Sequence, residues 1–277
     1  MMRLTDRLQR MHPGSSRTAV KGWLEGGRVQ VNGTVIRRGD VTVEESDHVA
    51  LTATPPPAFP ASLLRRVHED DDILVVDKPP GLLTVATERE RERTAYRALA
   101  DYVTGQPAHR RLFIVHRLDR ETSGLLVFAK SGAAKRALQE QFERRTVERR
   151  YVAVVEGRVK EAEGTLRDHL REDPTLLVRP TRDRRGGKEA ITQYRVLECR
   201  RTATVLELSL VTGRRGQIRA QLAALGHPLV GDARYGSRRD PVRRVCLHAR
   251  RLGFVHPRDG RRVSFDSPVP AAFARVV

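Results

Sequence analysis

The sequence contains few cysteines, few aromatic residues and no long apolar run. Cys199 and Cys246 are the only cysteines among 277 residues, and aromatic side chains make up 5%. The two cysteines form no Cys-X-X-Cys spacing and no histidines cluster beside them, which argues against a disulfide framework and against a zinc site. We therefore expect a protein of a reducing compartment that holds no metal.

Apolar stretches such as residues 125–129 are far shorter than the roughly 20 residues that cross a bilayer as a helix. Near the N-terminus, Arg3, Asp6 and Arg7 stand where a signal peptide would carry an apolar run. These features predict a soluble, cytoplasmic protein with no membrane partner. A chain of this length can bury a sizeable core, as one large domain or as a large and a small one.

Acidic residues are outnumbered by basic ones. Lys and Arg total 52 against 34 Asp and Glu, which gives a formal net charge of +18. Such a surplus favours a polyanionic partner such as nucleic acid, because binding releases the counterions condensed on phosphates. The alternative is a GC-rich genome, since 46 of the 52 basic residues are arginine.

A proline-rich stretch divides the sequence. Four prolines fall within residues 54–61, and they lack the amide donors that a regular helix or sheet needs. We interpret this stretch as a linker between a small module, residues 1–53, and a domain of residues 62–277. In the module, the spacing of Leu4, Leu8 and Met11 predicts a helix, Ser16 can cap a second helix, and Asn32-Gly33 predicts a hairpin turn.

The second region mixes strands and helices without a regular alternation. Strands are expected at residues 73–76, 125–129, 151–155 and 205–211, and helices at 132–145 and 217–225. This pattern predicts an α+β fold built on a mostly antiparallel sheet with flanking helices.

One segment, residues 115–129, places a single carboxylate in a turn between two apolar stretches. Arg117 and Asp119 are two residues apart, so in extended backbone their side chains point to the same side. A neighbouring guanidinium favours the ionised carboxylate that a nucleophile or base requires. An Asp flanked by Arg in a turn is, however, more often part of a structural ion pair. The residues alone leave both interpretations open.

The sequence His116-Arg117-Leu118-Asp119 and its continuation to Lys130 resemble the signature "HRLDxxTSGLLxxAK" of the RluA family of pseudouridine synthases. Further blocks resemble the family in the same order along nearly the whole chain: residues 75–82, 151–157, 187–194, 217–219, 226–236, 247–252 and 267–270. Residues 1–53 resemble the small RNA-binding module found in many of these enzymes, in a small-subunit ribosomal protein and in tyrosyl-tRNA synthetases. In that module the segments equivalent to 16–24 and 27–33 face the RNA. A small structural cap is the alternative for this segment.

The resemblance implies an isomerase that breaks the bond between ribose and uracil nitrogen, turns the base, and rejoins it through carbon. Asp119 would be the catalytic carboxylate, which stabilises or captures the positive sugar as in glycosidases. No cofactor is implied, in agreement with the lack of a dinucleotide-binding glycine motif and of a metal-ligand cluster. Whether Asp119 attacks the sugar or removes a ribose proton stays open.

Three further residues match positions that bind substrate in the family. Tyr151 would stack on the extruded base, Arg219 would pair with Asp119, and Arg117 would enter the RNA helix where the uridine leaves. The alternatives are an ordinary strand aromatic for Tyr151, a surface helix arginine for Arg219, and a structural partner of Asp119 for Arg117. The family pattern "GRTHQIRxHL" has two histidines where this chain has Gly216 and Gln221, which makes the loop before Arg219 unusual.

The expected partner is therefore RNA, with large-subunit ribosomal RNA preferred and tRNA as an alternative substrate, and the expected state is a monomer. A synthase fold that has lost turnover and serves as an RNA-binding or assembly protein is the main functional alternative. A hydrolase that releases a base is disfavoured, because no second carboxylate stands beside the motif to activate water.

Overall fold

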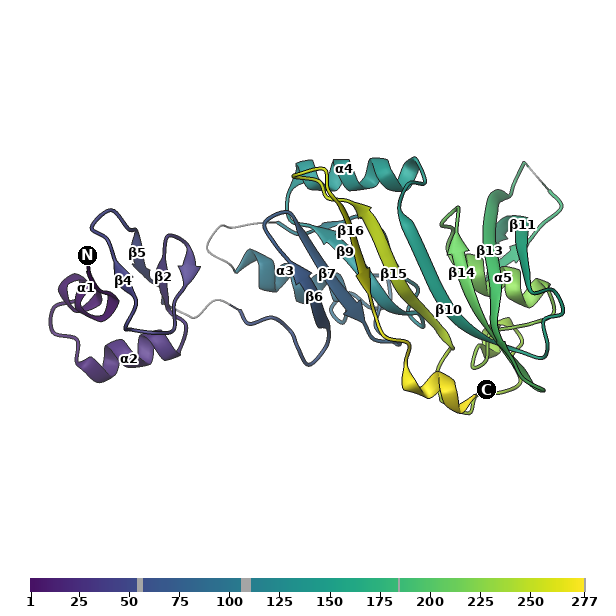
Figure 1. The fold of residues 1–277 in the computed structure, drawn as a ribbon, viewed down its shortest axis with the longest axis horizontal. Helices are drawn as coiled ribbons and strands as arrows, with labels where there is room; N and C mark the ends of the chain where they lie inside the picture. Colours follow the sequence, from purple (N-terminus) through teal and green to yellow (C-terminus); the bar gives the residue numbers. More distant parts are fainter. Residues whose placement is uncertain (54–56, 106–110, 184, 277) are drawn as a thin grey trace. The chain divides into compact units, whose positions relative to one another are not determined.

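The computed structural model describes residues 1–53, 57–105, 111–183 and 185–276 (Figure 1). The chain divides into two compact units, one of residues 1–60 with 98–112 and one of residues 61–97 with 113–277. The division into a module of residues 1–53, a linker of 54–61 and a domain of 62–277 stays a prediction. Residues 54–56 of that linker lie outside the described residues.

The first unit has the pattern that its sequence predicts. The Ser16 side chain caps the second helix by accepting a hydrogen bond from the amide of Ala19 at 3.1 Å. Asn32 and Gly33 both have positive φ, as a two-residue type I′ hairpin turn requires. A small core of buried aliphatic residues, including Leu4 and Leu24, joins helices to strands. The elements are β1 (Met2–Arg3), α1 (Leu4–Met11), α2 (Arg17–Glu25), β2 (Val29–Val31), β3 (Thr34–Val35), β4 (Thr42–Val43) and β5 (Val49–Leu51).

The second unit is built on one large sheet, in the order β12-β11-β13-β14-β10-β15-β9-β7-β6. Neighbouring strands are antiparallel except for β15 and β9, which are parallel, so the α+β prediction with a mostly antiparallel sheet is confirmed. Two further strands pair at its side, β16 with β15 and β8 with β9. The strands are β6 (Arg65–Glu69), β7 (Ile73–Lys78), β8 (Phe113–Ile114), β9 (Ser123–Ala129), β10 (Glu148–Glu156), β11 (Glu163–Glu172), β12 (Val178–Pro180), β13 (Lys188–Cys199), β14 (Ala203–Leu210), β15 (Leu247–Val255) and β16 (Arg262–Asp266).

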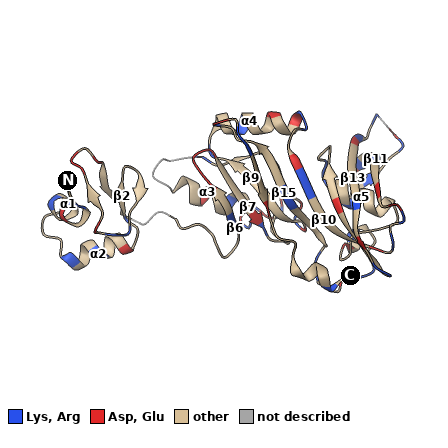
Figure 2. Cartoon of the chain, in the orientation of Figure 1, with Lys and Arg blue, Asp and Glu red and all other residues tan. Residues whose placement is uncertain are grey.

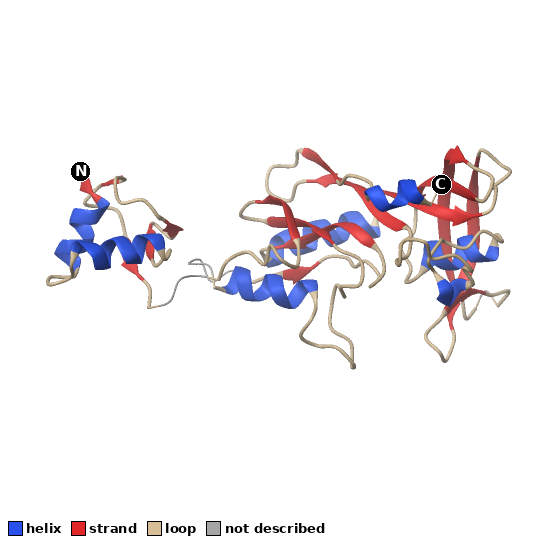
Figure 3. Cartoon of the chain, turned by 90° about the horizontal axis from the view of Figure 1, so that it is seen from below, coloured by secondary structure: helices blue, strands red, loops and turns tan. Residues whose placement is uncertain are grey.

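Helices flank this sheet, as Figure 3 shows in blue. Helix α4 (Gly132–Glu143) packs against β9 and β15, and α5 (Gln217–Ala224) packs against β11 and β12. The remaining helical segments are α3 (Ala95–Thr104), η1 (Ala233–Tyr235) and η2 (Ala271–Arg275). Within the described residues, no helix is both long enough and apolar enough to cross a membrane.

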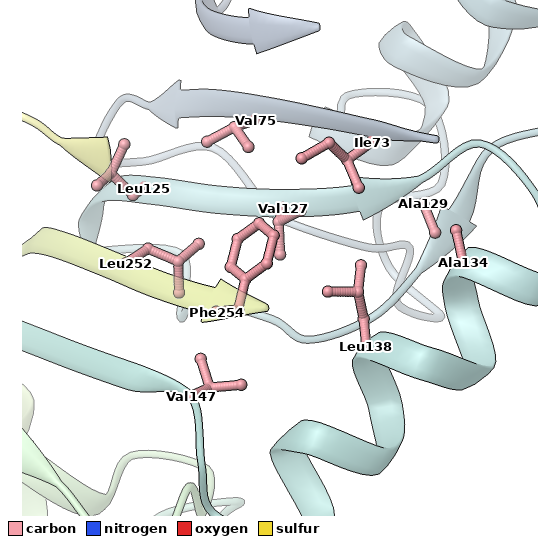
Figure 4. Packing of buried hydrophobic residues seen from close by; sticks show 10 residues of the cluster. All are labelled: Ile73, Val75, Leu125, Val127, Ala129, Ala134, Leu138, Val147, Leu252 and Phe254. Atoms are coloured by element: carbon pink, nitrogen blue, oxygen red, sulfur yellow. The ribbon is translucent and has the colours of Figure 1, made fainter. Parts of the chain in front are cut away.

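The core between α4 and the sheet fixes the strand that follows the Asp119 segment. Leu138 of α4 packs with Val127 of β9 and Phe254 of β15 in one fully buried cluster (Figure 4). Burying an aliphatic or aromatic side chain of this size stabilises a fold by roughly 1.5–3 kcal/mol. The cluster therefore anchors β9 firmly, and the loop that precedes β9 starts from a rigid base.

The first residues of β9 come unusually close to β15. Gly124 has φ of +111°, and a Cβ atom built there would lie 2.2 Å from the carbonyl oxygen of Ala249. Only glycine tolerates both conditions. The close parallel pairing of Ser123 with His248 and of Gly124 with Ala249 sets the point at which the chain turns into β9.

Asp70 joins the turn after β6 to the end of β15. One carboxylate oxygen accepts hydrogen bonds from the amides of Asp72 and Ile73 at 2.8 and 2.9 Å. The other meets Nε2 of His68 at 2.7 Å and Nε2 of His256 at 3.1 Å. Partial burial opposes ionisation, but the hydrogen bonds from His68 and the two amides outweigh it and lower the pKa of Asp70 to about 2.

We predict that Asp70→Asn lowers the free energy of unfolding at pH 7 by about 1–2 kcal/mol, a figure reduced for partial exposure. A folded-state pKa below the unfolded value means that the contribution is complete above about pH 4 and fades as the pH falls towards 2. Urea unfolding of both proteins at a series of pH values should show their difference shrinking over that interval. A difference that does not change with pH would contradict this assignment.

Candidate active site

The Asp119 segment forms the wall of a cleft of about 450 Å³ in the second unit. The other walls come from β10, from the end of β14 and from the loop that leads into α5. Asp119, Arg117, Tyr151 and Arg219 all line this cleft, although the first and last of them in the sequence, Arg117 and Arg219, are 102 positions apart. The fold therefore brings together all four site residues that the sequence predicts.

Main-chain contacts hold the Asp119 segment in place. The Thr84 hydroxyl donates to the carbonyl of Leu118 at 2.8 Å and accepts from the amide of Leu118 at 3.1 Å. The amide of Gly81 donates to the carbonyl of Arg120 at 2.8 Å. The residues on both sides of Asp119 are thus tied to the turn that follows β7, so its carboxylate starts from a fixed backbone.

Lys78 completes this attachment, and the sequence analysis gave it no role. Its side chain is fully buried, and Nζ donates to the carbonyls of Pro79, Leu82 and Arg120 at 2.9, 2.7 and 3.2 Å. Burial lowers the pKa of Lys78 to about 7, against the opposing effect of Glu121 and Asp119. The sequence signal for this structural role was the position of the lysine at the end of an apolar strand, directly before Pro-Pro-Gly. The strand expected at residues 73–76 extends to Lys78, because β7 pairs with β9 as far as that residue.

Asp119 has no ion-pair partner within 4 Å among the described residues, so the structural ion pair considered for it, including the one with Arg117, is wrong. Burial raises the pKa of Asp119, and the positive charges of Arg219 and Arg117 oppose that effect while Glu121 adds to it. Neighbouring guanidinium groups favour the ionised carboxylate, as the sequence predicts, but burial of the carboxylate opposes them and is the larger effect. Asp119 lines the cleft, and its carboxylate makes no hydrogen bond to the part of the chain that the structure describes.

Arg219 is buried, so the surface-arginine alternative is wrong, but its expected pair with Asp119 is wrong too. Nε and Nη2 donate to the two carboxylate oxygens of Asp232 at 2.7 and 2.8 Å, and Nη1 donates to Glu121 at 2.8 Å. Asp232 is 1% exposed and needs a cation, because an unpaired buried carboxylate is very costly. The guanidinium of Arg219 is therefore bound to Asp232 and Glu121. It affects Asp119 only through the electrostatic effect of its positive charge.

Tyr151 presents its ring to the cleft from the centre of the sheet. The residue is 7% exposed, and its hydroxyl makes no hydrogen bond to the described residues. Burial raises the pKa of Tyr151 to about 12, so the hydroxyl stays protonated. The hydroxyl therefore has no protein partner among the described residues, and the stacking of Tyr151 on the base stays a prediction.

His116 belongs to the wall of the cleft. Its Nε2 accepts a hydrogen bond from the amide of Val127 at 3.1 Å, and its ring stacks on Phe142 with centroids 4.8 Å apart. Burial lowers the pKa of His116 to about 3, which keeps the ring neutral. Its role is structural, because its acceptor nitrogen is occupied.

The two positions where the family pattern has histidine are filled differently here. Gln221 accepts a hydrogen bond from the Thr192 hydroxyl at 2.6 Å and donates to Asp168 at 2.8 Å and to the carbonyl of Ala190 at 3.2 Å. Gln217 binds Thr192 as well, at 2.8 Å. These buried amides attach α5 to β13 and β11, so another residue substitutes for the missing histidine at 221.

Gly216 begins α5 in a left-handed conformation, with φ of +58°. A Cβ atom at this position would lie 2.8 Å from the hydroxyl oxygen of Tyr235. The ring of Tyr235 in turn packs beneath the Arg219 guanidinium, 4.9 Å from ring centroid to Cζ. A side chain at 216, including that of histidine, would therefore have to displace Tyr235 and would be strained by the positive φ.

We predict that Gly216→Ala destabilises the protein more than Gly226→Ala. Both glycines have positive φ, and alanine there costs about 1 kcal/mol from backbone strain. A Cβ at Gly226 meets no atom within 4 Å, whereas that at Gly216 meets Tyr235. Thermal unfolding of both variants measures the difference, and equal losses would show that Tyr235 does not restrict position 216.

Comparisons with known proteins identify the family of this chain. The sequence model of the family described as RNA pseudouridylate synthase matches residues 72–224, and that of the S4 domain matches residues 2–49. The chain is 36% identical over 272 residues to the RNA pseudouridine synthase YlyB of Bacillus subtilis, covering 95% of this chain and 88% of that protein. It is 34% identical over 300 residues to ribosomal large subunit pseudouridine synthase D of Escherichia coli K12, covering 99% of this chain and 89% of that protein.

Among solved structures, human RNA pseudouridylate synthase domain containing 1 superposes with a TM-score of 0.62 at 28% identity, covering 75% of this chain and 84% of that chain. The family match spans more than half of the sequence, and the identity to full-length relatives exceeds 30%. The chain therefore belongs to the RluA-type family of RNA pseudouridine synthases and carries an N-terminal S4 RNA-binding domain.

Proposed function

We propose that this RNA pseudouridine synthase modifies uridines of large-subunit ribosomal RNA and that Asp119 is its catalytic carboxylate. The observation that carries the assignment is the state of Asp119, which faces the cleft without an ion-pair partner on a backbone fixed from both sides. The preference for ribosomal RNA rests on the name of the Escherichia coli relative, which matches nearly the whole chain.

The chemistry assigns a role to each group that lines the cleft. Cleavage of the bond between C1′ and N1 leaves positive character on the ribose, which an adjacent carboxylate stabilises or captures. After the base turns, C5 bonds to C1′, C5 loses its proton and N1 gains one, so the product is an isomer of uridine. The ring of Tyr151 stacks on the base, and Arg117 enters the RNA stack that the uridine has left.

Arg219 positions this set without touching Asp119. Its ion pairs with Asp232 and Glu121 attach α5 to the segment after Asp119, and its charge favours the ionised carboxylate. An RNA-binding or assembly protein without turnover is the alternative function. The hydrogen bonds of Gln221 and the packing of Tyr235 at Gly216 weaken its main support, because they hold the region of Arg219 without the two histidines.

We infer that the S4 domain binds the structured RNA, in a protein that is monomeric and cytoplasmic. Its helix α2 carries Arg17 and Lys21, both exposed on the segment that faces RNA in related modules. Elsewhere, basic and acidic residues are interspersed along the strands of the large sheet (Figure 2). Many of those arginines are paired, such as Arg251 with Asp266.

We predict that Asp119→Asn abolishes pseudouridine formation in RNA from a strain that lacks the enzyme, while RNA affinity changes less than threefold. The amide has the same shape but cannot supply negative charge to the sugar. Product is measured by chemical labelling of pseudouridine in single-turnover reactions. Unimpaired turnover by this variant would contradict the assignment.

The same reaction gives a pH test of the wild-type protein. The ionised form is the active one and burial raises the pKa of Asp119, so activity should decline with acid at a higher pH than an ordinary Asp would allow. The sign follows from loss of the charged form as the pH falls through the raised value.

We predict that Arg17→Glu weakens binding to structured RNA and reduces the dependence of log Kd on log salt by about one phosphate contact, or 0.7–0.9 in slope. Arg10→Glu on α1 is the matched control, because it reverses the same charge on a helix outside the expected RNA face. Affinity is measured by filter binding between 50 and 300 mM salt. Equal losses in the two variants would leave only a nonspecific charge effect.

A further inference from the structure

Arg149 lies two residues before Tyr151 in β10 and lines the same cleft. Side chains two apart in a strand share one face, about 7 Å from each other. Burial is the main cause of the raised pKa of Tyr151. The positive charge of Arg149 lowers that pKa, and the negative charge of Asp119 raises it. Arg149 and Tyr151 therefore lie on one face of β10, in the cleft that Asp119 also lines.

The Arg149 side chain is held rigidly by groups that do not neutralise it. Nη2 donates to the main-chain carbonyls of Leu210 and Val211 at 3.2 and 3.3 Å. The guanidinium also lies over the ring of Phe142, with Cζ 5.6 Å from the centroid. No carboxylate lies within 4 Å of it among the described residues, its Nε is buried without a partner, and Nη1 makes no hydrogen bond to them.

Two other arginines of the cleft are paired with carboxylates. Arg219 pairs with Asp232 and Arg215 pairs with Glu172. A partly buried cation without a counter-charge is costly, and burial accordingly lowers the pKa of Arg149. An acceptor that enters the cleft would remove part of that cost, so Arg149 is a binding group that its own protein leaves unsatisfied.

Gly213 keeps the space for this group open. A Cβ atom at Gly213 would lie 2.5 Å from Nη1 of Arg149. Its neighbour is the flexible end of a side chain, so alanine at this position would displace the guanidinium rather than disrupt the fold. Glycine at position 213 therefore allows Arg149 to keep the conformation in which Nη1 is a free donor.

We propose that Nη1 of Arg149 donates a hydrogen bond to O4 of the target uracil and thereby selects uracil over cytosine. The proposal rests on the proposed function, in which the sugar lies at Asp119 and the base on Tyr151. A base in that position directs the edge opposite its glycosidic bond along β10, towards Arg149. Uracil presents an acceptor at C4, whereas cytosine presents an amino group that donates, so a fixed guanidinium binds the first and opposes the second.

The test measures binding in an Asp119→Asn background, so that no turnover occurs. The probes are three copies of a ribosomal RNA fragment that differ only at the modified position, which carries uridine, cytidine or an abasic ribose. The protein with Arg149 should bind the uridine RNA more tightly than the cytidine RNA. Arg149→Met should remove that preference with a roughly 10- to 100-fold loss of affinity for the uridine RNA, as expected for one charge-assisted hydrogen bond.

Two further variants separate the explanations. Arg150→Met removes the same charge from the opposite face of β10, where Arg150 pairs with Glu148, and should keep the preference. Gly213→Ala keeps the charge but displaces Nη1, and should lose the preference as Arg149→Met does. Gly213→Ala also provides the test of the proposal if Arg149→Met fails to fold.

Equal loss of affinity for all three RNAs would indicate a phosphate contact and would overturn the proposal. An unchanged preference for uridine in both Arg149→Met and Gly213→Ala would overturn it as well, by reducing Arg149 to a wall of the cleft. If the wild-type enzyme converts no uridine in the fragment, the proposed function fails first. If the wild-type enzyme converts the uridine and either of these two binding results is found, only the proposed role of Arg149 is rejected.

Discussion

The site depends on the attachment of one irregular segment, residues 117–122, to the turn that follows β7. Its own sequence cannot fix it, because it lies between strands and pairs with no neighbouring strand along its length. Thr84, Gly81 and the buried ammonium of Lys78 supply the missing contacts through the backbone of Leu118 and Arg120. The close approach of Gly124 to Ala249 fixes its far end. Asp119 is positioned by contacts to its neighbours, which leaves its own carboxylate unused.

The charged groups of the cleft are of two kinds: some are paired with other residues of the protein, and others are free to bind a substrate. Arg219 is occupied by Asp232 and Glu121 and contributes to Asp119 a field rather than a bond. Asp119 and Arg149 line the same cleft, and neither has an opposite charge within 4 Å among the described residues. A partly desolvated site with fixed, unpaired charges interacts strongly with a substrate that enters it, because no reorganisation is required at that moment.

Much of the architecture follows from local sequence signals. The Ser16 and Ser131 caps, the Asn32-Gly33 turn and the end of α5 before Gly226 each arise from chemistry within a few residues, and each is present. The family resemblance placed Asp119, Tyr151 and Arg219 in one site. Their contacts were less predictable, because the partner of Arg219 depends on the complete burial of Asp232, which only the tertiary fold determines.

The departures at 216 and 221 illustrate the same limit. From the sequence they weaken the site, since two histidines are missing. In the structure Gln221 makes three hydrogen bonds and Gly216 leaves room for Tyr235, so the loop is ordered by a different set of contacts. Lys78 and Arg149 escaped notice for a related reason. Burial, and not residue type, distinguishes them from the many other basic residues.

The proposed function requires Asp119 to isomerise uridines of large-subunit ribosomal RNA. The most direct measurement maps pseudouridine across total RNA from a wild-type strain, a deletion strain, and deletion strains that express the wild-type protein or Asp119→Asn. We expect specific large-subunit positions to lose pseudouridine on deletion and to regain it with the wild-type protein but not with Asp119→Asn. Restoration by the Asp119→Asn protein, or loss confined to other RNAs, would contradict it.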